Sequence, residues 1–366
     1  MIRIFFDILN FFRKEKFYAF LFVLNIGVIL YSSLAPKDNL YPNVRGREGS
    51  EILAQYQRSE AKLQDKIKSA GSIERYLSKR PRIGFLFWIF SILLPALFTA
   101  GLILDFLFLS RPRWRRRIHH TFPETTDWKI SMIFKVVLLL TAAAFVLSLL
   151  LGLLNRFLLP LSSNFFILFH TTVIDFLCLA FMVWAVRGAG GHWKDLGLRI
   201  PEGKFFREVL IGWAGYLALL PVFFIVLIGL LILAHWIGYE PPAHPLVYIF
   251  LEEEKRSPLL IGCSLFLAAV VGPIFEEFFF RGFCYPILKR KTGVLGAMLI
   301  TSALFALIHE NSFAFWPIFI LGMGLVYLYE KRSSLIGPIV LHMTHNAVFI
   351  FYFFFAKRIV MQEGSG

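Results

Sequence analysis

The sequence predicts an all-α, polytopic membrane protein: a bundle of about eight or nine transmembrane helices with a polar helical loop near the N-terminus. The first observation is composition, because 57% of the 366 residues are hydrophobic and only 17% are charged, whereas a soluble domain averages about 25% charged residues. The second is that apolar stretches long enough to span a bilayer recur along the whole chain. A soluble protein of this composition would lack polar surface, so that class is excluded.

Nine apolar segments are the candidate spans. They lie at 17–35, 84–109, 131–154, 164–186, 209–237, 258–285, 294–309, 314–329 and 335–356. The first follows the basic residues "RKEK", as a secretory signal would. Pro36 comes directly after the plausible cleavage position, which favours an uncleaved anchor.

The segment 37–82 is the one sizeable polar stretch. Apolar residues recur in it at helical spacing and predict an amphipathic helix outside or on the membrane: Ile52, Leu53, Tyr56, Leu63 and Ile67. A solvated helical connector is the simpler interpretation, and a specific binding element is the alternative.

The net charge of +14 raises the question of nucleic-acid binding. The sequence has neither zinc-finger spacing nor a soluble basic domain, so we expect no nucleic-acid partner. In a multi-span protein such charge gathers in loops, where it attracts anionic membrane lipids. The three cysteines, Cys178, Cys263 and Cys284, lie in apolar segments and form no disulfide pattern.

Three charges interrupt the phenylalanine-rich stretch "FEEFFFRGF" at residues 275–283. A charge at the bilayer centre costs about 2.5–3.5 kcal/mol on insertion scales, so we expect these charged residues to be paired or functional. Arg281 follows Glu277 by four residues and shares its helical face, which predicts a structural ion pair. Glu276 points about 100° away from Glu277 and is left without that partner.

Two further polar sites follow: "FALIH", which ends at His309, and "HMTHN", which runs from His342 to Asn346. If the chain turns near Gly293, Glu276 and His309 both lie about 16 residues from the turn, hence at matched depth on antiparallel helices. A glutamate in a low-dielectric pocket is a better general base and can take a proton from water. His342 and Asn346 can donate to the oxyanion of an attacked carbonyl. These residues predict amide hydrolysis within the membrane.

The same residues resemble the motifs of the CAAX protease and bacteriocin-processing (CPBP, or Abi) family of intramembrane proteases. The family pattern is EExxxR, FxxxH and HxxxN, here Glu276-Glu277-x-x-x-Arg281, Phe305-x-x-x-His309 and His342-x-x-x-Asn346. All three motifs are present in order and on predicted helices. The lead-in "DLGLRIPEGKFFREVLIGW" (195–213) also resembles bacterial members, and a bacterial cytoplasmic membrane is the expected location.

The resemblance covers residues 195–356 and leaves 1–190 as a separate N-terminal membrane region. It implies that Glu276 is the base, assisted by His309, with His342 and Asn346 stabilising the oxyanion. It implies a peptide or membrane-protein substrate, for which a lipidated tail is one form. No cofactor is required on this interpretation. If zinc were present, its ligands would be Glu276, His309 and His342.

Two other functions stay open. Buried charges also mark the ion paths of transporters and channels, and a non-catalytic immunity or scaffold protein can retain the same fold. His170 and Asp175 in the fourth span match no motif. We interpret them as hydrogen-bonding to neighbouring helices, with a role in lining an access path as the alternative. The role of His345 is open.

Overall fold

The computed structural model describes residues 2–34, 47–111, 128–157, 162–198, 205–239 and 257–364, and in these ranges the secondary structure is helical, without a strand. The helices are α1 (Ile2–Lys14), α2 (Lys16–Leu34), α4 (Arg47–Ser69), α5 (Ile73–Ser78), α6 (Pro81–Ser110), α8 (Ile130–Phe157), α9 (Ser163–Gly188), the 3₁₀ turn η1 (Trp193–Leu196), α10 (Phe205–Ile237), α12 (Pro258–Phe266), the π-helix η2 (Leu267–Val271), α13 (Gly272–Glu277), the π-helix η3 (Phe278–Cys284), α14 (Tyr285–Leu307), α15 (Phe315–Arg332) and α16 (Ile336–Gly364). The predicted all-α class is confirmed.

Six helical runs in the described ranges are long and apolar enough to cross a membrane, fewer than the nine predicted segments. One run, Pro258–Leu307, joins two predicted spans, although Gly293 interrupts it with φ 74° and ψ 179°. The helix of the first predicted span contributes only a shorter apolar stretch, Lys16–Gly27. Helix α15 ends in Glu330, Lys331 and Arg332, which lowers its apolar character. The chain is an integral, multi-pass membrane protein.

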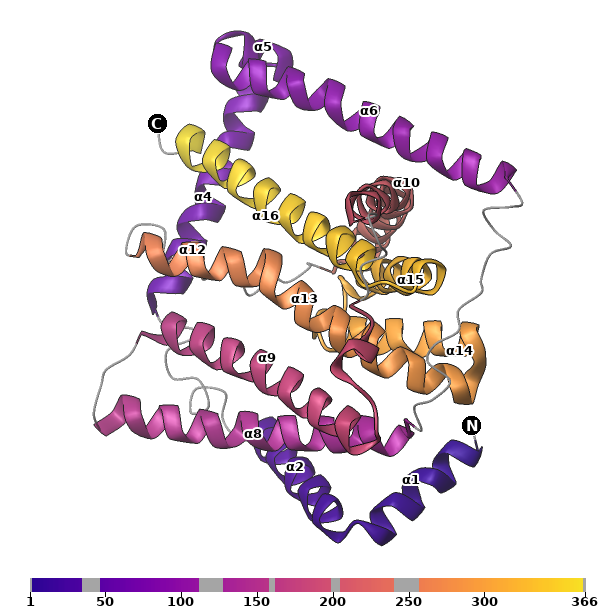
Figure 1. Ribbon diagram of the computed structural model, residues 1–366. Coiled ribbons are helices and arrows are strands. Elements are labelled where there is room, and N and C mark those ends of the chain that lie inside the picture. Colours follow the sequence, from indigo (N-terminus) through magenta and orange to yellow (C-terminus); the bar gives the residue numbers. More distant parts are fainter. Residues whose placement is uncertain are drawn as a thin grey trace.

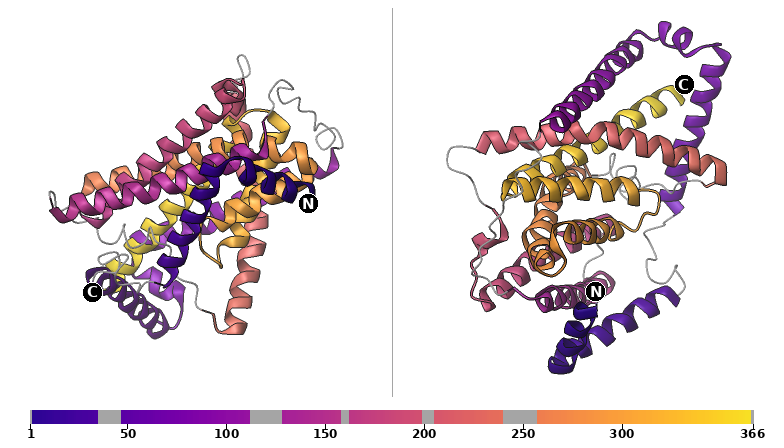
Figure 2. Two further views of the ribbon diagram at one scale, coloured as in Figure 1. Left: turned by 90° about the horizontal axis from the view of Figure 1, so that it is seen from below. Right: turned by 90° about the vertical axis from the view of Figure 1, so that its right-hand side faces the viewer.

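The helices pack as a layered bundle (Figure 1). Helices α8 and α9 lie side by side, and the run from α12 to α14 crosses the middle of the molecule above them. Helix α16 packs on α10 and on the π-helix η2, while α10 also contacts α6 and α15. The two N-terminal helices lie against α8, and Figure 2 shows them from two further sides.

The predicted polar helix is present as α4, and it packs along α16. Three of its predicted apolar positions, Tyr56, Leu63 and Ile67, are partly buried, whereas the neighbouring Lys62 and Lys68 are exposed. The side chains of Ile52 and Leu53 lie outside the described part of the chain, as do residues 37–46. The amphipathic pattern therefore corresponds to a helix with one face on the bundle.

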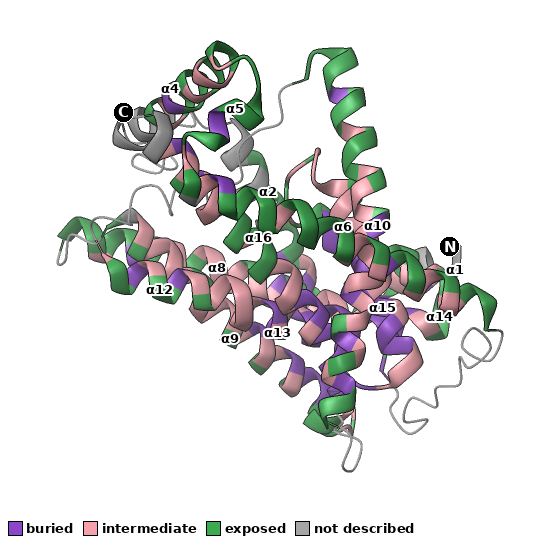
Figure 3. Ribbon diagram, turned by 90° about the horizontal axis from the view of Figure 1, so that it is seen from above, coloured by how far each residue is buried: buried purple, intermediate pink, exposed green. Residues whose placement is uncertain are grey.

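Burial is concentrated where α13, α14 and α15 meet (Figure 3). The largest core cluster includes Phe283, Tyr285 and Tyr329, and α9 contributes Met182 to it. Unlike the surface helices of a soluble protein, the outer helices expose large apolar side chains, such as Trp88 on α6 and Ile225 on α10. Such surfaces suit lipid.

The turn η1 and the residue that follows it pack against the C-terminal region. Leu196 is buried, and its carbonyl lies so close to Gly282 that a Cβ built there would be 2.2 Å from the Leu196 oxygen. Gly197 follows with φ 93°, a conformation that favours glycine. Its carbonyl accepts a hydrogen bond of 3.1 Å from the Leu335 amide. The lead-in segment is thus seated directly against the π-helix that carries Arg281.

We expect the Gly282→Ala variant to be destabilised by about 1–3 kcal/mol, because backbone atoms must move to admit the methyl group. The measurement is thermal unfolding of the purified protein in detergent. Gly152→Ala is the matched control, since a Cβ at Gly152 meets nothing within 4 Å and alanine has the higher helix propensity. Equal stability of the two variants would contradict the close packing of Leu196 on Gly282.

Candidate active site

Glu276 and Glu277 end α13, a single-turn α-helix held between two π-helices. π-helical turns are rare and occur mostly at functional sites. Within α13 the two glutamates point about 100° apart, so they face different partners. Glu277 is fully buried, whereas the Glu276 side chain keeps 32% of its surface exposed.

In the first π-helix, η2, one backbone carbonyl lacks a hydrogen-bond donor within the helix. In it the Gly272 amide bonds to the Leu267 carbonyl, five residues earlier. By the same pattern the Ala268 carbonyl would bond to the amide of residue 273, but Pro273 has no N–H. The Asn346 side chain supplies the missing donor, with Nδ2 2.9 Å from the Ala268 oxygen. This bond ties α16 to the segment that carries the glutamates.

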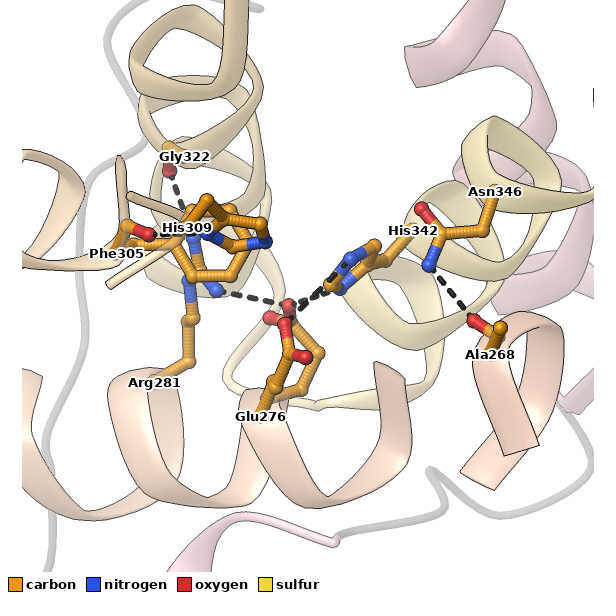
Figure 4. A network of polar contacts seen from close by, with 9 residues as sticks. Ala268, Glu276, Arg281, Phe305, His309, Gly322, His342 and Asn346 are labelled. Atoms are coloured by element: carbon orange, nitrogen blue, oxygen red, sulfur yellow. Dashed lines mark hydrogen bonds and ion pairs between the residues drawn. The ribbon is translucent and has the colours of Figure 1, made fainter. Parts of the chain in front are cut away.

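The predicted pair of Glu277 and Arg281 is present and is part of a larger network (Figure 4). Arg281 Nη1 donates to Glu277 Oε1 at 2.8 Å, with both side chains fully buried. Its Nη2 donates to the Gly322 carbonyl on α15 at 3.2 Å. The guanidinium also lies 4.5 Å from the centre of the Phe305 ring, a cation–π distance.

His342 connects the two glutamates. Its Nδ1 lies 2.9 Å from Glu277 Oε1 and its Nε2 lies 3.8 Å from Glu276 Oε2. An ionised carboxylate can only accept a hydrogen bond, so His342 Nδ1 carries a hydrogen and donates it to Glu277 Oε1. The 3.8 Å separation is too long for a hydrogen bond, so Nε2 faces Glu276 without being bonded to it.

His309 lies outside the helix that was predicted to carry it. Helix α14 ends at Leu307, and His309 occupies the turn that follows. The helix ends there because the His309 ring, through Nδ1, contacts the Phe305 carbonyl at 2.7 Å, and its own amide bonds to Ala306. Since the carbonyl accepts, Nδ1 donates and Nε2 is left with a lone pair.

The turn and the ring contacts bring the predicted residues together at one place. The Phe305 ring lies 5.0 Å from the His309 ring and 5.5 Å from the His342 ring, edge to face in both cases. Figure 4 shows Glu276 below the two imidazoles, with His309 to one side and His342 to the other. Glu276 Oε2 is buried and has no hydrogen-bond partner among the described residues. A carboxylate between two imidazoles is suited to moving protons.

The sequence offered Glu276, His309 and His342 as the possible ligands of a zinc ion. Within the described ranges, no three His, Cys, Asp or Glu side chains are arranged to hold a metal ion. We therefore derive no chemical step through zinc.

Sequence reasoning missed the second role of Glu277. It was predicted only as the partner of Arg281, yet the same oxygen also accepts from His342 and so orients that ring. The spacing of four residues indicates only the local pair, whereas His342 is 65 residues away in sequence. Phe305 was part of a recognised motif, and the structure adds that its ring packs against both His309 and His342.

The other polar residues of the membrane region have separate environments. His170 Nε2 lies 3.0 Å from Ser148 Oγ and 3.1 Å from the Ala144 carbonyl, which confirms its predicted bonding to a neighbouring helix. Asp175 has no such bond to another described residue, so that prediction is wrong for Asp175. The ring of His345 packs among aromatic side chains, with Phe223 the nearest at 5.3 Å.

We expect Asn346→Ala to lower the stability by about 1–3 kcal/mol, because it leaves the Ala268 carbonyl without its donor. The check is thermal unfolding in detergent, with Asn10→Ala as the control, because Asn10 is an exposed asparagine on α1. A loss of turnover with unchanged unfolding temperature would instead indicate that Asn346 acts only as a hydrogen-bond donor to the oxyanion.

Comparison with known proteins agrees with the motifs. Residues 258–348, about a quarter of the chain, match the family model described as type II CAAX prenyl endopeptidase Rce1-like. The chain is 31% identical over 102 residues to "Membrane-embedded CAAX protease MroQ" of Staphylococcus aureus (strain USA300), a match that covers 25% of this chain and 40% of that protein. It is 29% identical over 100 residues to "Putative membrane peptidase YdiL" of Bacillus subtilis (strain 168), covering 26% and 41%. No solved structure matches the chain.

The matched region spans about two-fifths of each curated relative. It contains Glu276, Arg281, His309, His342 and Asn346, the residues that the structure gathers around the α13 turn. The three motifs and these matches agree, and residues 258–348 of this chain are similar to the CAAX protease (CPBP) family of membrane proteases.

Proposed function

We propose that this protein is an intramembrane endopeptidase that hydrolyses a peptide bond with a water activated by Glu276. The observation that carries the proposal is the arrangement of Glu276: a partly exposed carboxylate with one buried, unpartnered oxygen, facing His342 Nε2 at 3.8 Å. Relatives named as membrane proteases support the reaction class. Glu276 is the proposed base because its side chain is partly exposed, whereas Glu277 is fully buried and accepts from Arg281 and His342.

In the reaction, Glu276 takes a proton from water as the water oxygen attacks the peptide carbonyl carbon. His309 Nε2, which has a lone pair, accepts the second hydrogen of that water and orients it. The tetrahedral intermediate then collapses with cleavage of the C–N bond. Glu276 returns the proton to the departing amine, so the enzyme is regenerated unchanged.

The negative oxygen of the intermediate needs donors. His342 donates through Nε2 only as an imidazolium, because its Nδ1 already donates to Glu277. Asn346 uses one N–H for Ala268 and has the second for the oxyanion.

The substrate is a peptide or a membrane protein that reaches the site within the bilayer. The relatives come from bacteria, which supports a place in a bacterial cytoplasmic membrane. We propose no nucleic-acid partner, and the region 1–190 is proposed as an N-terminal unit beside the protease region 195–356.

The test is product analysis by mass spectrometry after purified protein in lipid nanodiscs is incubated with a library of membrane-spanning peptides, both plain and lipidated. We expect cleavage at an internal peptide bond by the wild type. An ion-flux assay in liposomes runs in parallel with the Glu276→Ala variant. No cleavage together with an ion flux that Glu276→Ala changes would establish a transporter, and no cleavage without flux would indicate a scaffold.

A further inference from the structure

One face of α9 carries an open groove of about 700 Å³, a volume within the range of small-molecule sites. Positions three or four residues apart share one side of a helix, and the side opposite the groove is buried in the bundle through Cys178, Met182 and Ala185. The groove therefore opens toward the membrane rather than toward the core. Its lining consists of Phe176, Leu179, Ala180, Val183, Trp184, Arg187 and Gly188.

The length of the groove matches one leaflet of a bilayer. Phe176 lies at the middle of the apolar span Asn164–Gly188, and Arg187 lies at its end. The two residues are eleven positions apart, which is about 16 Å along a helix. Half of the hydrocarbon core of a bilayer is about 15 Å thick. Arg187 is thus placed at the level of the lipid headgroups when Phe176 is at the bilayer centre.

Basic residues gather at the headgroup end of the groove. Arg187 is exposed, and its guanidinium has no hydrogen bond or ion pair to any residue in the part of the chain that the structure describes. The start of α8 lies beside this end of α9, because a Cβ built on Gly191 would be 3.2 Å from Trp128 Nε1. Lys129 and Lys194 therefore lie at the same end, and both are exposed.

The two parts of the groove define the chemistry of its ligand. The apolar lining from Phe176 to Trp184 fits a hydrocarbon chain, whereas Arg187 fits a phosphate, whose oxygens match the guanidinium donors. A free phosphate would leave the apolar lining uncovered, and a neutral chain would leave Arg187 unpaired. The three cations at this end favour a headgroup with a net negative charge over a zwitterionic one.

We propose that this groove binds one anionic phospholipid, with its phosphate on Arg187 and an acyl chain along α9 as far as Phe176. The inner end of the chain reaches an aromatic contact, because the rings of Phe176 and Phe275 meet edge to face with their centres 5.1 Å apart. Phe275 directly precedes Glu276. The bound lipid packs α9 against the segment that carries the candidate active site, and its binding does not depend on peptide cleavage.

The test is native mass spectrometry of the delipidated protein in detergent, titrated with phosphatidylglycerol or with phosphatidylcholine of the same acyl chains. We expect the wild type to retain one phosphatidylglycerol and to bind it more tightly than phosphatidylcholine. Arg187→Gln should bind phosphatidylglycerol about fivefold more weakly, because it removes one basic residue from the headgroup level. Ala180→Trp fills the groove and should lose the retained lipid. Excess inorganic phosphate should not displace it.

Two substitutions outside the groove are the matched controls. Arg156→Gln changes an exposed arginine in the last turn of α8, and Ala96→Trp changes an exposed alanine on α6. Both should bind phosphatidylglycerol as the wild type does, and thermal unfolding of each lipid-free variant separates lost binding from misfolding. Equal affinity of the wild type for the two lipids, unchanged binding by Arg187→Gln, or displacement by inorganic phosphate would overturn the proposal. Retention of a lipidated peptide but of neither phospholipid would also overturn it and assign the groove to a substrate chain.

Discussion

Replacing Glu276 by glutamine is expected to lower kcat by on the order of 10³, since general-base catalysis contributes about 10²–10⁴. Glutamine has the same shape and still faces His342 Nε2, which lies 3.8 Å from the carboxylate oxygen in the wild type. Its amide cannot take a proton from water, so only the base is removed. The measurement is the turnover of a cleaved library peptide under saturating conditions.

Glu60→Gln is the control for this substitution, because Glu60 is an exposed glutamate on α4. It should turn over peptide at the wild-type rate. Thermal unfolding should be the same in all three proteins. Turnover by Glu276→Gln above a tenth of the wild-type rate would remove Glu276 from the role of base.

Replacing Arg281 by methionine is expected to have the largest effect on stability, about 3–5 kcal/mol. The change removes the donors to Glu277 and to the Gly322 carbonyl and leaves Glu277 as a fully buried charge without its cation. Methionine preserves most of the length of the side chain and its packing on the Phe305 ring, so the loss is electrostatic. Thermal unfolding in detergent measures it.

The double variant Glu277→Gln/Arg281→Met removes both charges together. It should recover much of the loss, because the penalty comes from the unpaired charge rather than from the absence of the pair. Arg58→Met on the exposed face of α4 is the control and should change stability by less than about 0.5 kcal/mol. A double variant that is less stable than Arg281→Met would contradict a neutralising role for the pair.

Part of the site was predictable because residues three or four apart in a helix share a face. The pair of Glu277 and Arg281 follows from helical periodicity alone, and it forms at 2.8 Å even though the segment is π-helical. The matched depths of Glu276 and His309 were predicted on the condition that the chain turns near Gly293, and the backbone leaves the helical conformation there.

What could not be predicted depends on contacts between distant segments. The bond of His342 to Glu277 requires α16 to pack on α13, and no periodicity encodes that register. Helix propensity does not distinguish the π-helices Leu267–Val271 and Phe278–Cys284 from α-helix, so the sequence predicted only a continuous helix there.

The most direct test of the account is the turnover of one cleaved peptide by purified wild type and Glu276→Gln, each measured untreated, after chelation, and after zinc is added back. We predict wild-type turnover that chelation leaves unchanged, and turnover by Glu276→Gln that is lower by on the order of 10³ under every condition. Loss of wild-type turnover on chelation with recovery on added zinc, or turnover by Glu276→Gln above a tenth of the wild-type rate, would contradict hydrolysis by a glutamate-activated water.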